Sequence, residues 1–245
     1  MFDFTCHKNA LHERVILITG AGDGIGRQAA LSYAEHGATV ILLGKTVAKL
    51  ESVYDEIVNA GYSQPAIIPL DLKGATAQHY QDMAGTIEQQ FGRLDGLLHN
   101  ASILTVLSPF DEVEEDSFDD IMQVNVKAPF IMTQALLPLL RATKTSSIVF
   151  TSSGVGRKGR AFWGGYAISK FATEGMMETL ADEMGGTNVR VNSINPGATA
   201  TQMRARAYPG EDAKTLKTPL DLMPLYLYLM ADDSIEINGQ SINAQ

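Results

Sequence analysis

Cysteine is nearly absent from this chain: Cys6 stands alone, so no disulfide can form within it. A lone cysteine suits a reducing compartment. The sequence also lacks any stretch that approaches the roughly 20 apolar residues of a membrane span. Its first eight residues hold no apolar segment of the kind that forms the core of a signal peptide. We therefore expect a soluble, cytoplasmic protein with no membrane partner.

Positive charge is also scarce. The 245 residues include 19 Lys and Arg against 28 Asp and Glu, which gives a formal net charge of −9. Binding to nucleic acid or to an anionic membrane surface requires clustered cations, so this composition argues against both partners. Apolar residues, in contrast, make up 45% of the chain and charged residues only 19%, which is enough to build a large core and excludes a disordered chain.

Two kinds of stretch alternate along the chain. Short apolar runs rich in β-branched residues, typical of strands buried on both faces of a parallel sheet, are expected at 15–18, 39–43, 65–72, 94–98, 147–151, 189–194 and 239–243. Helices are expected at 27–36, 47–60, 76–91, 118–141, 163–184 and from Thr218 onward, with a bend at Pro224. No linker, repeat or low-complexity tract interrupts the alternation. We predict the α/β class, with one doubly wound parallel sheet, helices on both faces, and a single domain over residues 1–245.

A glycine-rich turn directly follows the first expected strand and precedes a helix. Between Thr19 and Gly26, glycines occupy positions 20, 22, 24 and 26. Such a turn lets the backbone approach a pyrophosphate closely, while the helix N-terminus offers free N–H groups to the phosphate oxygens. A turn that binds no ligand is the alternative interpretation. The strand–turn–helix context favours a Rossmann-type, NAD(P)-binding domain.

The second expected strand ends without a carboxylate. An NAD-binding protein usually has Asp or Glu there to bind the ribose 2′-hydroxyl. Here the strand ends in Leu43-Gly44-Lys45, which places a cation where the adenosine ribose should lie. We predict a preference for NADP(H), with Lys45 on the 2′-phosphate and NAD(H) also possible. A solvated loop lysine is the alternative role for Lys45.

Tyr166 and Lys170 lie four residues apart at the start of an expected helix, so they share a face. A lysine ammonium beside a phenol favours the phenolate and makes the phenol a better proton donor near neutral pH. Taken alone, such a pair is more commonly a half-exposed helix face. The interpretation as a catalytic pair therefore depends on other residues.

Two further residues support the catalytic interpretation. Ser153 follows the expected strand 147–151, at the carboxyl end where ligands bind in open α/β sheets, and Ser152 is the alternative. Asn125 lies inside the expected helix 118–141, where a polar residue can disturb the helix and free a carbonyl. Pro129, four residues later, cannot donate to that carbonyl.

Together these motifs resemble the short-chain dehydrogenase/reductase family over residues 15–245. The resemblance depends on Thr-Gly-x3-Gly-x-Gly at 19–26, Asn-Ala-Ser at 100–102, Tyr-x3-Lys at 166–170, a serine 13 residues before the tyrosine, and Pro-Gly at 196–197. The stretches 150–153, 171–177 and 216–219 resemble the YciK branch of bacterial oxidoreductases. The three residues between Tyr166 and Lys170 do not match the six usual in enoyl reductases. Sugar epimerases and dehydratases are usually longer than 300 residues and use a different glycine spacing.

The resemblance implies hydride transfer between a nicotinamide and a carbonyl or alcohol carbon. Tyr166 would donate the proton, Ser153 would hold the substrate oxygen, Lys170 would lower the Tyr166 pKa and bind the nicotinamide ribose, and Asn125 would hold a water that reprotonates Lys170. No metal is implied. Cofactor contacts are implied for Gly20, Gly22, Asp23, Gly24, Ile25, Gly26, Lys45, Asp71, Leu72, Asn100, Ala101, Tyr166, Lys170, Pro196, Gly197, Thr199 and Thr201.

The chain departs from the family pattern at three positions. Many NADP-preferring relatives have a basic residue where this chain has Asp23. His99 replaces an asparagine, and we expect it to be a structural hydrogen-bonding residue. Ser102 replaces a glycine, which predicts backbone strain or a shifted loop.

Two loops beside the expected site bear on the substrate. Residues 154–163 contain three cations and two aromatics. These side chains could recognise an anionic or planar substrate. The simpler alternative is that the cations are solvated and the aromatic rings pack under the start of the following helix. Residues 199–217 are polar and long, so we expect a substrate lid there. The predicted partner is a small-molecule carbonyl or alcohol.

Helices 118–141 and 163–184 also suggest a homodimer or homotetramer, because relatives associate through these faces. An NADP-binding sensor or scaffold with little turnover is the alternative function, but the complete set of four catalytic residues favours an enzyme.

Overall fold

A seven-stranded parallel sheet forms the centre of the computed structural model, which describes residues 2–245. The strand order is β3-β2-β1-β4-β5-β6-β7, and every neighbouring pair is parallel. The strands are β1 (Val15–Thr19), β2 (Thr39–Gly44), β3 (Ala66–Pro69), β4 (Gly96–His99), β5 (Ser146–Thr151), β6 (Val189–Asn195) and β7 (Ser241–Asn243). Because β1, β4 and β5 are buried at every residue, their sequences do not alternate between polar and apolar residues, and their centres are apolar.

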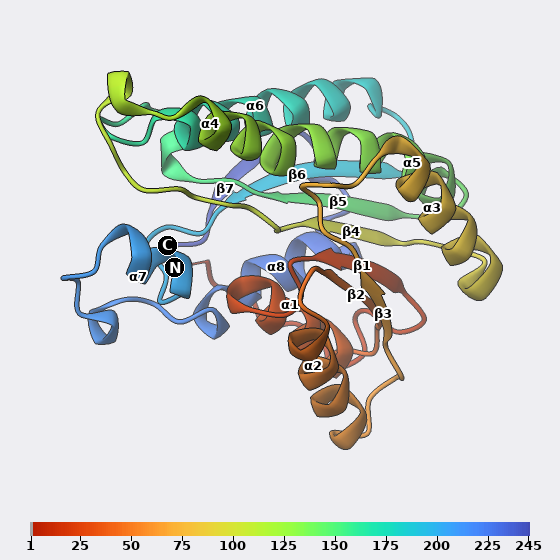
Figure 1. Ribbon diagram of the computed structural model, residues 1–245. Helices are drawn as coiled ribbons and strands as arrows, with labels where there is room; N and C mark the ends of the chain where they lie inside the picture. Colours follow the sequence, from red (N-terminus) through yellow and green to blue (C-terminus); the bar gives the residue numbers. More distant parts are fainter. Residues whose placement is uncertain (1) are drawn as a thin grey trace.

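Helices cover both faces of this sheet (Figure 1). On one face lie α1 (Gly24–Glu35), α2 (Val47–Asn59) and α8 (Met223–Met230). On the other face lie α3 (Ala77–Phe91), α5 (Ala128–Arg141) and α6 (Gly164–Glu183). The prediction of a doubly wound Rossmann-type α/β fold is confirmed.

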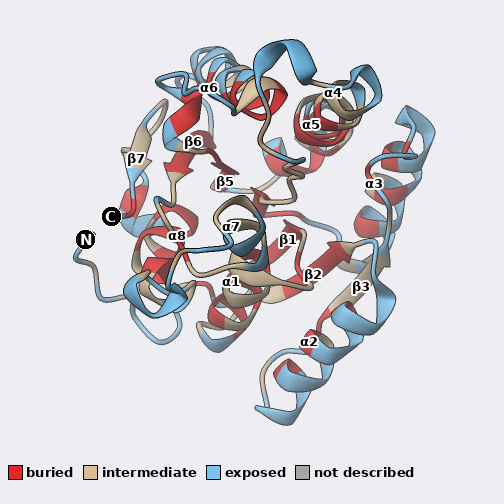
Figure 2. Ribbon diagram, turned by 60° about the vertical axis from the view of Figure 1, so that its left-hand side comes forward, coloured by how far each residue is buried: buried red, intermediate tan, exposed pale blue. Residues whose placement is uncertain are grey.

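The core is divided into two layers by the sheet. Ile16 and Ile18 of β1 pack in the cluster under α1, α2 and α8, whereas Val15 and Leu17 pack in the cluster under α3, α5 and α6. Successive side chains of a strand point to opposite faces, so one apolar run supplies both layers. Figure 2 shows buried residues concentrated on the strands and on the helix faces turned toward them.

The expected helix 118–141 is present as one continuous helical run that begins three residues earlier, at Glu115, and contains a π-turn. The segment contains α4 (Glu115–Met122), a π-helical turn η2 (Gln123–Lys127) and then α5. The Ala128 N–H donates to the Gln123 carbonyl, the i to i+5 bond of a π-turn. Asn125 lies inside this turn, so the expected local disturbance of the helix at Asn125 is present.

The last helix also differs from the prediction. It begins at Met223, after a 3-10 turn η5 (Leu220–Leu222). Pro224 therefore lies in the first helical turn, where its missing N–H removes no intrahelical bond and causes no bend. Thr218 does help to start the segment, because its backbone N–H and its hydroxyl both donate to Asp221 Oδ2 at 2.7 Å.

Residues 199–217, the expected substrate lid, are partly helical. They hold α7 (Gln202–Ala207), capped by the Thr201 hydroxyl, and the 3-10 turn η4 (Ala213–Thr215). Three more 3-10 turns are η1 (Phe110–Glu112), η3 (Gly154–Gly156) and η6 (Asp232–Ser234). Across residues 2–245, no helix is long and apolar enough to cross a membrane.

Candidate active site

The strand order reverses between β1 and β4, and the glycine turn lies at this point. The Thr19 hydroxyl accepts hydrogen bonds from the backbone N–H groups of Asn100 at 2.9 Å and Ala101 at 3.0 Å. It joins the carboxyl ends of two strands that are about 80 residues apart in the chain. In open α/β sheets, ligands bind in the crevice at this position.

Two glycines of the turn are required by its own packing. Gly20 has a φ of +68°, and a Cβ there would lie 3.1 Å from the Ala101 Cα. A Cβ on Gly26 would lie 2.3 Å from the Gly20 carbonyl oxygen, which no side chain tolerates. The turn is therefore compact, and α1 begins at Gly24 directly behind it.

Asp23 caps α1 and forms an ion pair with Lys49 of α2. Its Oδ1 accepts from the Gly24 N–H at 2.7 Å, and its Oδ2 is paired with the Lys49 ammonium. The hydrogen bond from Lys49 is the main cause that holds the Asp23 pKa below its usual value. Lys45 is exposed. Lys49 adds a second cation beside the turn, and the sequence interpretation missed it. Its spacing of four residues from Lys45 was the available signal for a second cation near the same site.

Asn125 fastens the loop after β4 to the start of α6. Its side-chain amide accepts from the Ile103 N–H at 2.8 Å and donates to the Ile103 carbonyl at 2.9 Å. The same amide donates to the Ser169 hydroxyl at 3.1 Å, and Ser169 in turn donates to the Tyr166 carbonyl at 2.8 Å. The buried Asn125 side chain therefore holds the backbone of the loop after β4 and, through Ser169, the helical turn that carries Tyr166 and Lys170.

Tyr166 and Lys170 lie together on α6 as expected, and both are buried, with exposed fractions of 7% and 4%. The Lys170 ammonium donates to the Thr151 carbonyl at 2.9 Å and lies 5.4 Å from the centre of the Tyr166 ring. Burial lowers the Lys170 pKa to about 8, although the Glu174 charge opposes this change. Thr151, at the end of β5, is a contact that sequence reasoning missed.

Burial raises the Tyr166 pKa to about 12, and the hydroxyl dipoles of Ser102 and Ser153 oppose that rise. The sequence predicted that Lys170 lowers this pKa; without cofactor the net change is upward, and the Lys170 charge is not among its causes. Ser153 comes from the end of β5, and its hydroxyl also caps η3 through the Val155 N–H at 3.5 Å.

Ser102 does not have the strained backbone that its replacement of a glycine predicted. Only Glu13 and Phe162 among the non-glycine residues of the described chain have a positive φ. Serine is therefore accommodated without a left-handed conformation, so of the two expected alternatives the backbone strain is absent and the shifted loop remains a prediction. The Ser102 hydroxyl is buried and has no hydrogen-bond partner of good geometry within residues 2–245.

The loop after β6 approaches the glycine turn. Gly197 has a φ of +70°, and Thr199 is buried with its hydroxyl 3.3 Å from the Pro196 carbonyl. Thr201 caps α7 and lies against the turn, since a Cβ on Gly24 would be 3.4 Å from its methyl group. The loop of Pro196, Gly197 and Thr199, expected to contact the cofactor, and the start of the expected lid thus lie at the same carboxyl edge of the sheet as the glycine turn.

Aromatic rings lie beside Tyr166. The Trp163 ring is 5.6 Å from the Tyr166 ring and 6.1 Å from the Tyr208 ring, which belongs to the expected lid. Arg204 stacks on Tyr208 at 3.9 Å and forms two bonds of 2.6 Å to Glu211.

The three cations of residues 154–163 have different surroundings. Arg157 bonds Asn243 Oδ1 at 2.7 Å and the Ser241 hydroxyl, which makes it a structural residue. Lys158 and Arg160 are exposed, as the solvated-charge alternative expects.

The remaining candidates lie at two other strand ends. Asp71 is exposed and accepts from the Lys73 N–H at 3.1 Å, while Leu72 is buried. His99 is buried, bonds the Thr133 hydroxyl at 2.8 Å and stacks on Phe150, so the structural role expected for it agrees with its contacts. Burial lowers its pKa to about 3.

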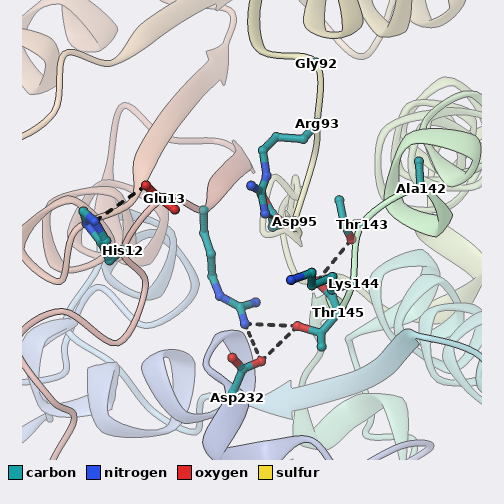
Figure 3. Close-up of a pocket in the computed structure, with 11 residues that line it drawn as sticks. His12, Glu13, Gly92, Arg93, Asp95, Ala142, Thr143, Lys144, Thr145 and Asp232 are labelled. Carbon is teal, nitrogen blue, oxygen red and sulfur yellow. Dashed lines mark hydrogen bonds and ion pairs between the residues drawn. The ribbon is translucent and has the colours of Figure 1, made fainter.

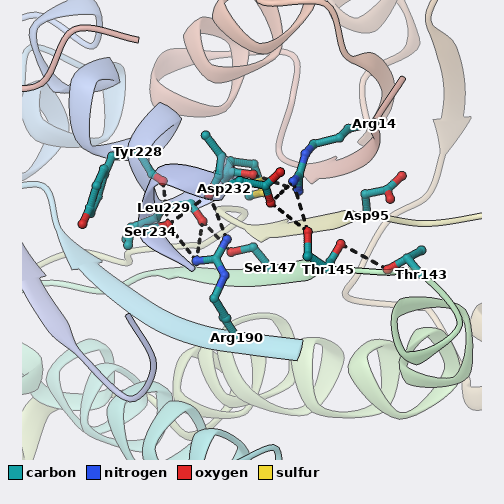
Figure 4. A network of polar contacts seen from close by, with 12 residues as sticks. Arg14, Asp95, Thr143, Thr145, Ser147, Arg190, Tyr228, Leu229, Asp232 and Ser234 are labelled. Carbon is teal, nitrogen blue, oxygen red and sulfur yellow. Dashed lines mark hydrogen bonds and ion pairs between the residues drawn. The ribbon is translucent and has the colours of Figure 1, made fainter. Parts of the chain in front are cut away.

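A cavity of about 580 Å³ lies at the opposite edge of the sheet, away from all of these residues. It contains the Arg14–Asp232 and Arg93–Asp95 ion pairs (Figure 3). A neighbouring network fastens α8 and η6 to the sheet, with Arg190 donating to Ser234 at 2.7 Å and to the Ala231 carbonyl at 3.0 Å (Figure 4). The guanidinium groups of Arg14, Arg93 and Arg190 are held by carboxylate, hydroxyl or carbonyl oxygens, so this edge has a structural character. Within residues 2–245, no group of three or more His, Cys, Asp and Glu side chains is arranged to hold a metal ion.

Comparison with known proteins gives matches over nearly the whole chain. A family model described as short chain dehydrogenase matches residues 14–212. The Escherichia coli (strain K12) oxidoreductase YciK is 53% identical over 238 residues, which cover 97% of this chain and 94% of YciK. A short-chain dehydrogenase from Shigella flexneri, solved in complex with NADP, has a TM-score of 0.96 and 53% identity and covers 98% of this chain and 100% of that chain. The 3-oxoacyl-[acyl-carrier-protein] reductase FabG of Thermotoga maritima is 32% identical over 244 residues, which cover 95% of this chain and 96% of that protein.

Proposed function

The chain belongs to the short-chain dehydrogenase family and is an NAD(P)-dependent oxidoreductase of CH–OH and C=O groups, and from this premise we propose that it reduces a small-molecule carbonyl compound with NADPH. The family resemblance inferred from the motifs is confirmed, and so is its YciK branch. One observation carries the proposal: Tyr166, Lys170 and Ser153 converge at the carboxyl edge of the sheet, with both members of the Tyr–Lys pair buried.

The residues at this edge fit a dinucleotide. The turn between β1 and α1 is too tight for side chains at Gly20 and Gly26, and α1 starts immediately behind it. The N-terminus of a helix attracts phosphate through its free N–H groups and its dipole. Gly22, Gly24, Ile25, Asn100 and Ala101 would complete the pyrophosphate side, and Asp71 and Leu72 the adenine side.

The preference for NADPH is supported by the charges near the second strand. Asp23 would repel a 2′-phosphate, but its ion pair with Lys49 neutralises it. Lys45 is exposed beside this pair and is available to the phosphate. The similar Shigella flexneri protein was solved with NADP.

In the proposed reduction, the bound nicotinamide supplies a hydride to the carbonyl carbon. Tyr166 gives its phenolic proton to the carbonyl oxygen, which becomes the alcohol. Ser153 donates a hydrogen bond to that oxygen and fixes its position. Lys170 keeps a positive charge near the phenolate that remains, and Pro196, Gly197, Thr199 and Thr201 border the nicotinamide. Asn125 holds the surrounding backbone in position.

The substrate would enter under residues 199–217, which we propose act as a lid over Tyr166. Trp163 and Tyr208 bring aromatic surface to this position. The remaining parts of the proposal are a single domain over residues 1–245, a cytoplasmic location and assembly into a homodimer or homotetramer.

The test is oxidation of NADPH with a broad panel of aldehydes and ketones, measured at 340 nm. The Tyr166→Phe variant should lose about two to four orders of magnitude in kcat, the range expected for a positioned proton donor. Tyr80→Phe is a matched control, because Tyr80 is also buried but lies on α3 with its hydroxyl unpartnered in the described chain. Tight NADPH binding without turnover of any compound would contradict the proposal and favour a sensor or scaffold.

A further inference from the structure

The side chains that pack around Tyr166 are apolar. Two of them are buried together with it, and three more are partly buried against this group: Val155 and Ala167, then Leu104, Trp163 and Met203. They come from the loop after β4, from η3, from the start of α6 and from α7 in the expected lid. Segments that are far apart in the sequence thus surround one phenol with hydrocarbon. A group attached to a carbonyl that reaches this phenol would therefore lie against apolar side chains.

The partly or fully buried cations of the same segments are held by other groups. The Arg204 guanidinium of α7 bonds both carboxylate oxygens of Glu211 at 2.6 Å and stacks on the Tyr208 ring. The Arg157 guanidinium is bonded to side chains of β7. The Lys170 ammonium donates to the carbonyl at the end of β5. An anionic group buried beside the reacting carbonyl would thus have to compete with these contacts for a positive partner, and a buried charge without one is strongly unfavourable.

Three other cations, Lys158, Arg160 and Arg206, are exposed to solvent. An anionic substrate bound by one of them is the competing possibility, and the experiments below distinguish it.

Phe162 adds an apolar ring directly before Trp163. It is 59% exposed and has a φ of +73°, a left-handed conformation that is rare and unfavourable for a bulky side chain. Its carbonyl accepts a hydrogen bond from the Ser108 N–H at 3.3 Å, which fastens it to the loop that also carries Leu104. Backbone strain that is kept in a folded protein is common at binding sites, so this exposed ring is consistent with the approach of an apolar molecule.

We propose that the site takes a carbonyl compound whose carbonyl carries an uncharged, apolar group, and that Trp163 is the residue that selects this group. The inference depends on the proposed function, because it names the substrate class of the same site. The Trp163 ring lies 5.6 Å from the Tyr166 ring and 6.1 Å from the Tyr208 ring, so it connects the proton donor with the expected lid. An apolar group beside it gains buried area, and an aromatic ring gains a stacking contact as well.

The first test compares substrates of nearly equal shape and different charge. In para-methylbenzaldehyde and para-carboxybenzaldehyde a methyl group is exchanged for a carboxylate, and hexanal and 6-oxohexanoate form the equivalent aliphatic pair. The kcat/KM for NADPH oxidation should be roughly 100-fold higher for the uncharged member of each pair, because the carboxylate would be buried without a cation. Equal values, or higher values for the carboxylates, would overturn the inference and leave the proposed reduction intact.

The second test changes Trp163. Trp163→Ala should lower kcat/KM for para-methylbenzaldehyde about tenfold, mainly through KM, while Trp163→Phe should keep most of it. Trp163→Arg should raise kcat/KM for para-carboxybenzaldehyde, since it supplies the missing cation. The matched control is Tyr54→Ala, at a partly buried aromatic residue of α2, which should leave the preference unchanged. A loss in Trp163→Ala that is equal for the charged and uncharged aldehydes would show a merely structural role and refute selection by Trp163.

A third measurement needs no turnover. Trp163 is the only tryptophan of the chain, so the intrinsic tryptophan fluorescence reports on this position alone. In the NADP-loaded Tyr166→Phe variant, para-methylbenzyl alcohol should quench this fluorescence at a concentration at least about tenfold lower than para-carboxybenzyl alcohol. Quenching at equal concentrations, or by neither compound, would refute the inference. Selective quenching together with no turnover by the wild type would support the ligand class and contradict only the proposed function.

Discussion

Two buried bases, Lys170 and His99, have pKa values well below those of the free side chains. In each case burial is the largest cause, because a charged group loses solvation inside the protein. Their proton affinities therefore couple the stability of the fold to pH.

For Lys170 the folded-state pKa is about 8, against 10.5 for the free group. The unfolded chain binds more protons between these values, so stability should rise as pH increases from about 8 to 10.5. Between pH 7.5 and 9.5 the expected contribution is about 2 kcal/mol. Urea unfolding at both pH values should show this rise in the wild type and lack it in Lys170→Met, which keeps the length but removes the charge. An equal change of unfolding free energy with pH in the two proteins would contradict this role of Lys170.

For His99 the pKa falls from 6.5 to about 3, so the folded state keeps this ring neutral. The unfolded chain takes up the proton first as pH falls, and stability is lost below pH 6.5. At pH 5 the loss should be about 2 kcal/mol. His99→Gln, which can still bond Thr133, should unfold at a urea concentration that changes less between pH 7 and pH 5. Exposed His12 supplies the control, because His12→Gln should follow the wild type.

At the scale of elements, the start of α2 brings Lys49 against the glycine turn and leaves Lys45 at the end of β2. Lys45→Ala should weaken NADPH binding by roughly tenfold, the effect of one charge-assisted contact to phosphate, and leave NADH nearly unchanged. Fluorescence titration with both cofactors measures this. Equal weakening of NADPH and NADH binding would remove Lys45 from the phosphate site.

Lys49→Ala should also weaken the binding of NADPH selectively, since Asp23 is then unpaired beside the phosphate.

The sequence predicted the elements whose signal is local. Strand β1, the glycine turn and the Tyr166–Lys170 spacing were recognisable because each depends on neighbouring residues. The π-turn η2 was predicted only as a disturbance, because helical periodicity continues through it and only Asn125 and Pro129 interrupt the pattern. The spacing of Lys49 from Lys45 was visible in the sequence, but its ion pair with Asp23 was not, because the two residues are 26 positions apart in the chain.

At the scale of the whole molecule, three apolar side chains remain exposed on α5 and α6: Phe130 at 51%, Ile168 at 40% and Phe171 at 47%. An apolar face that stays exposed on a folded chain favours association. Sedimentation at micromolar concentration should therefore show a dimer or tetramer rather than a 26.5 kDa species. Phe171→Glu should shift it toward the monomer. Phe110→Glu, at a more exposed phenylalanine on η1, should not. A monomeric wild type would refute the assembly.

The central position of β1 in the sheet has a consequence for folding during synthesis. The first strand to leave the ribosome pairs with β2 after 44 residues, but its other edge stays open until β4 is made, at residues 96–99. Unpaired strand edges are templates for aggregation, and pairings between distant segments form slowly. Chains truncated before β4 should therefore aggregate during translation, because β1 depends on a segment about 80 residues later to cover its second edge.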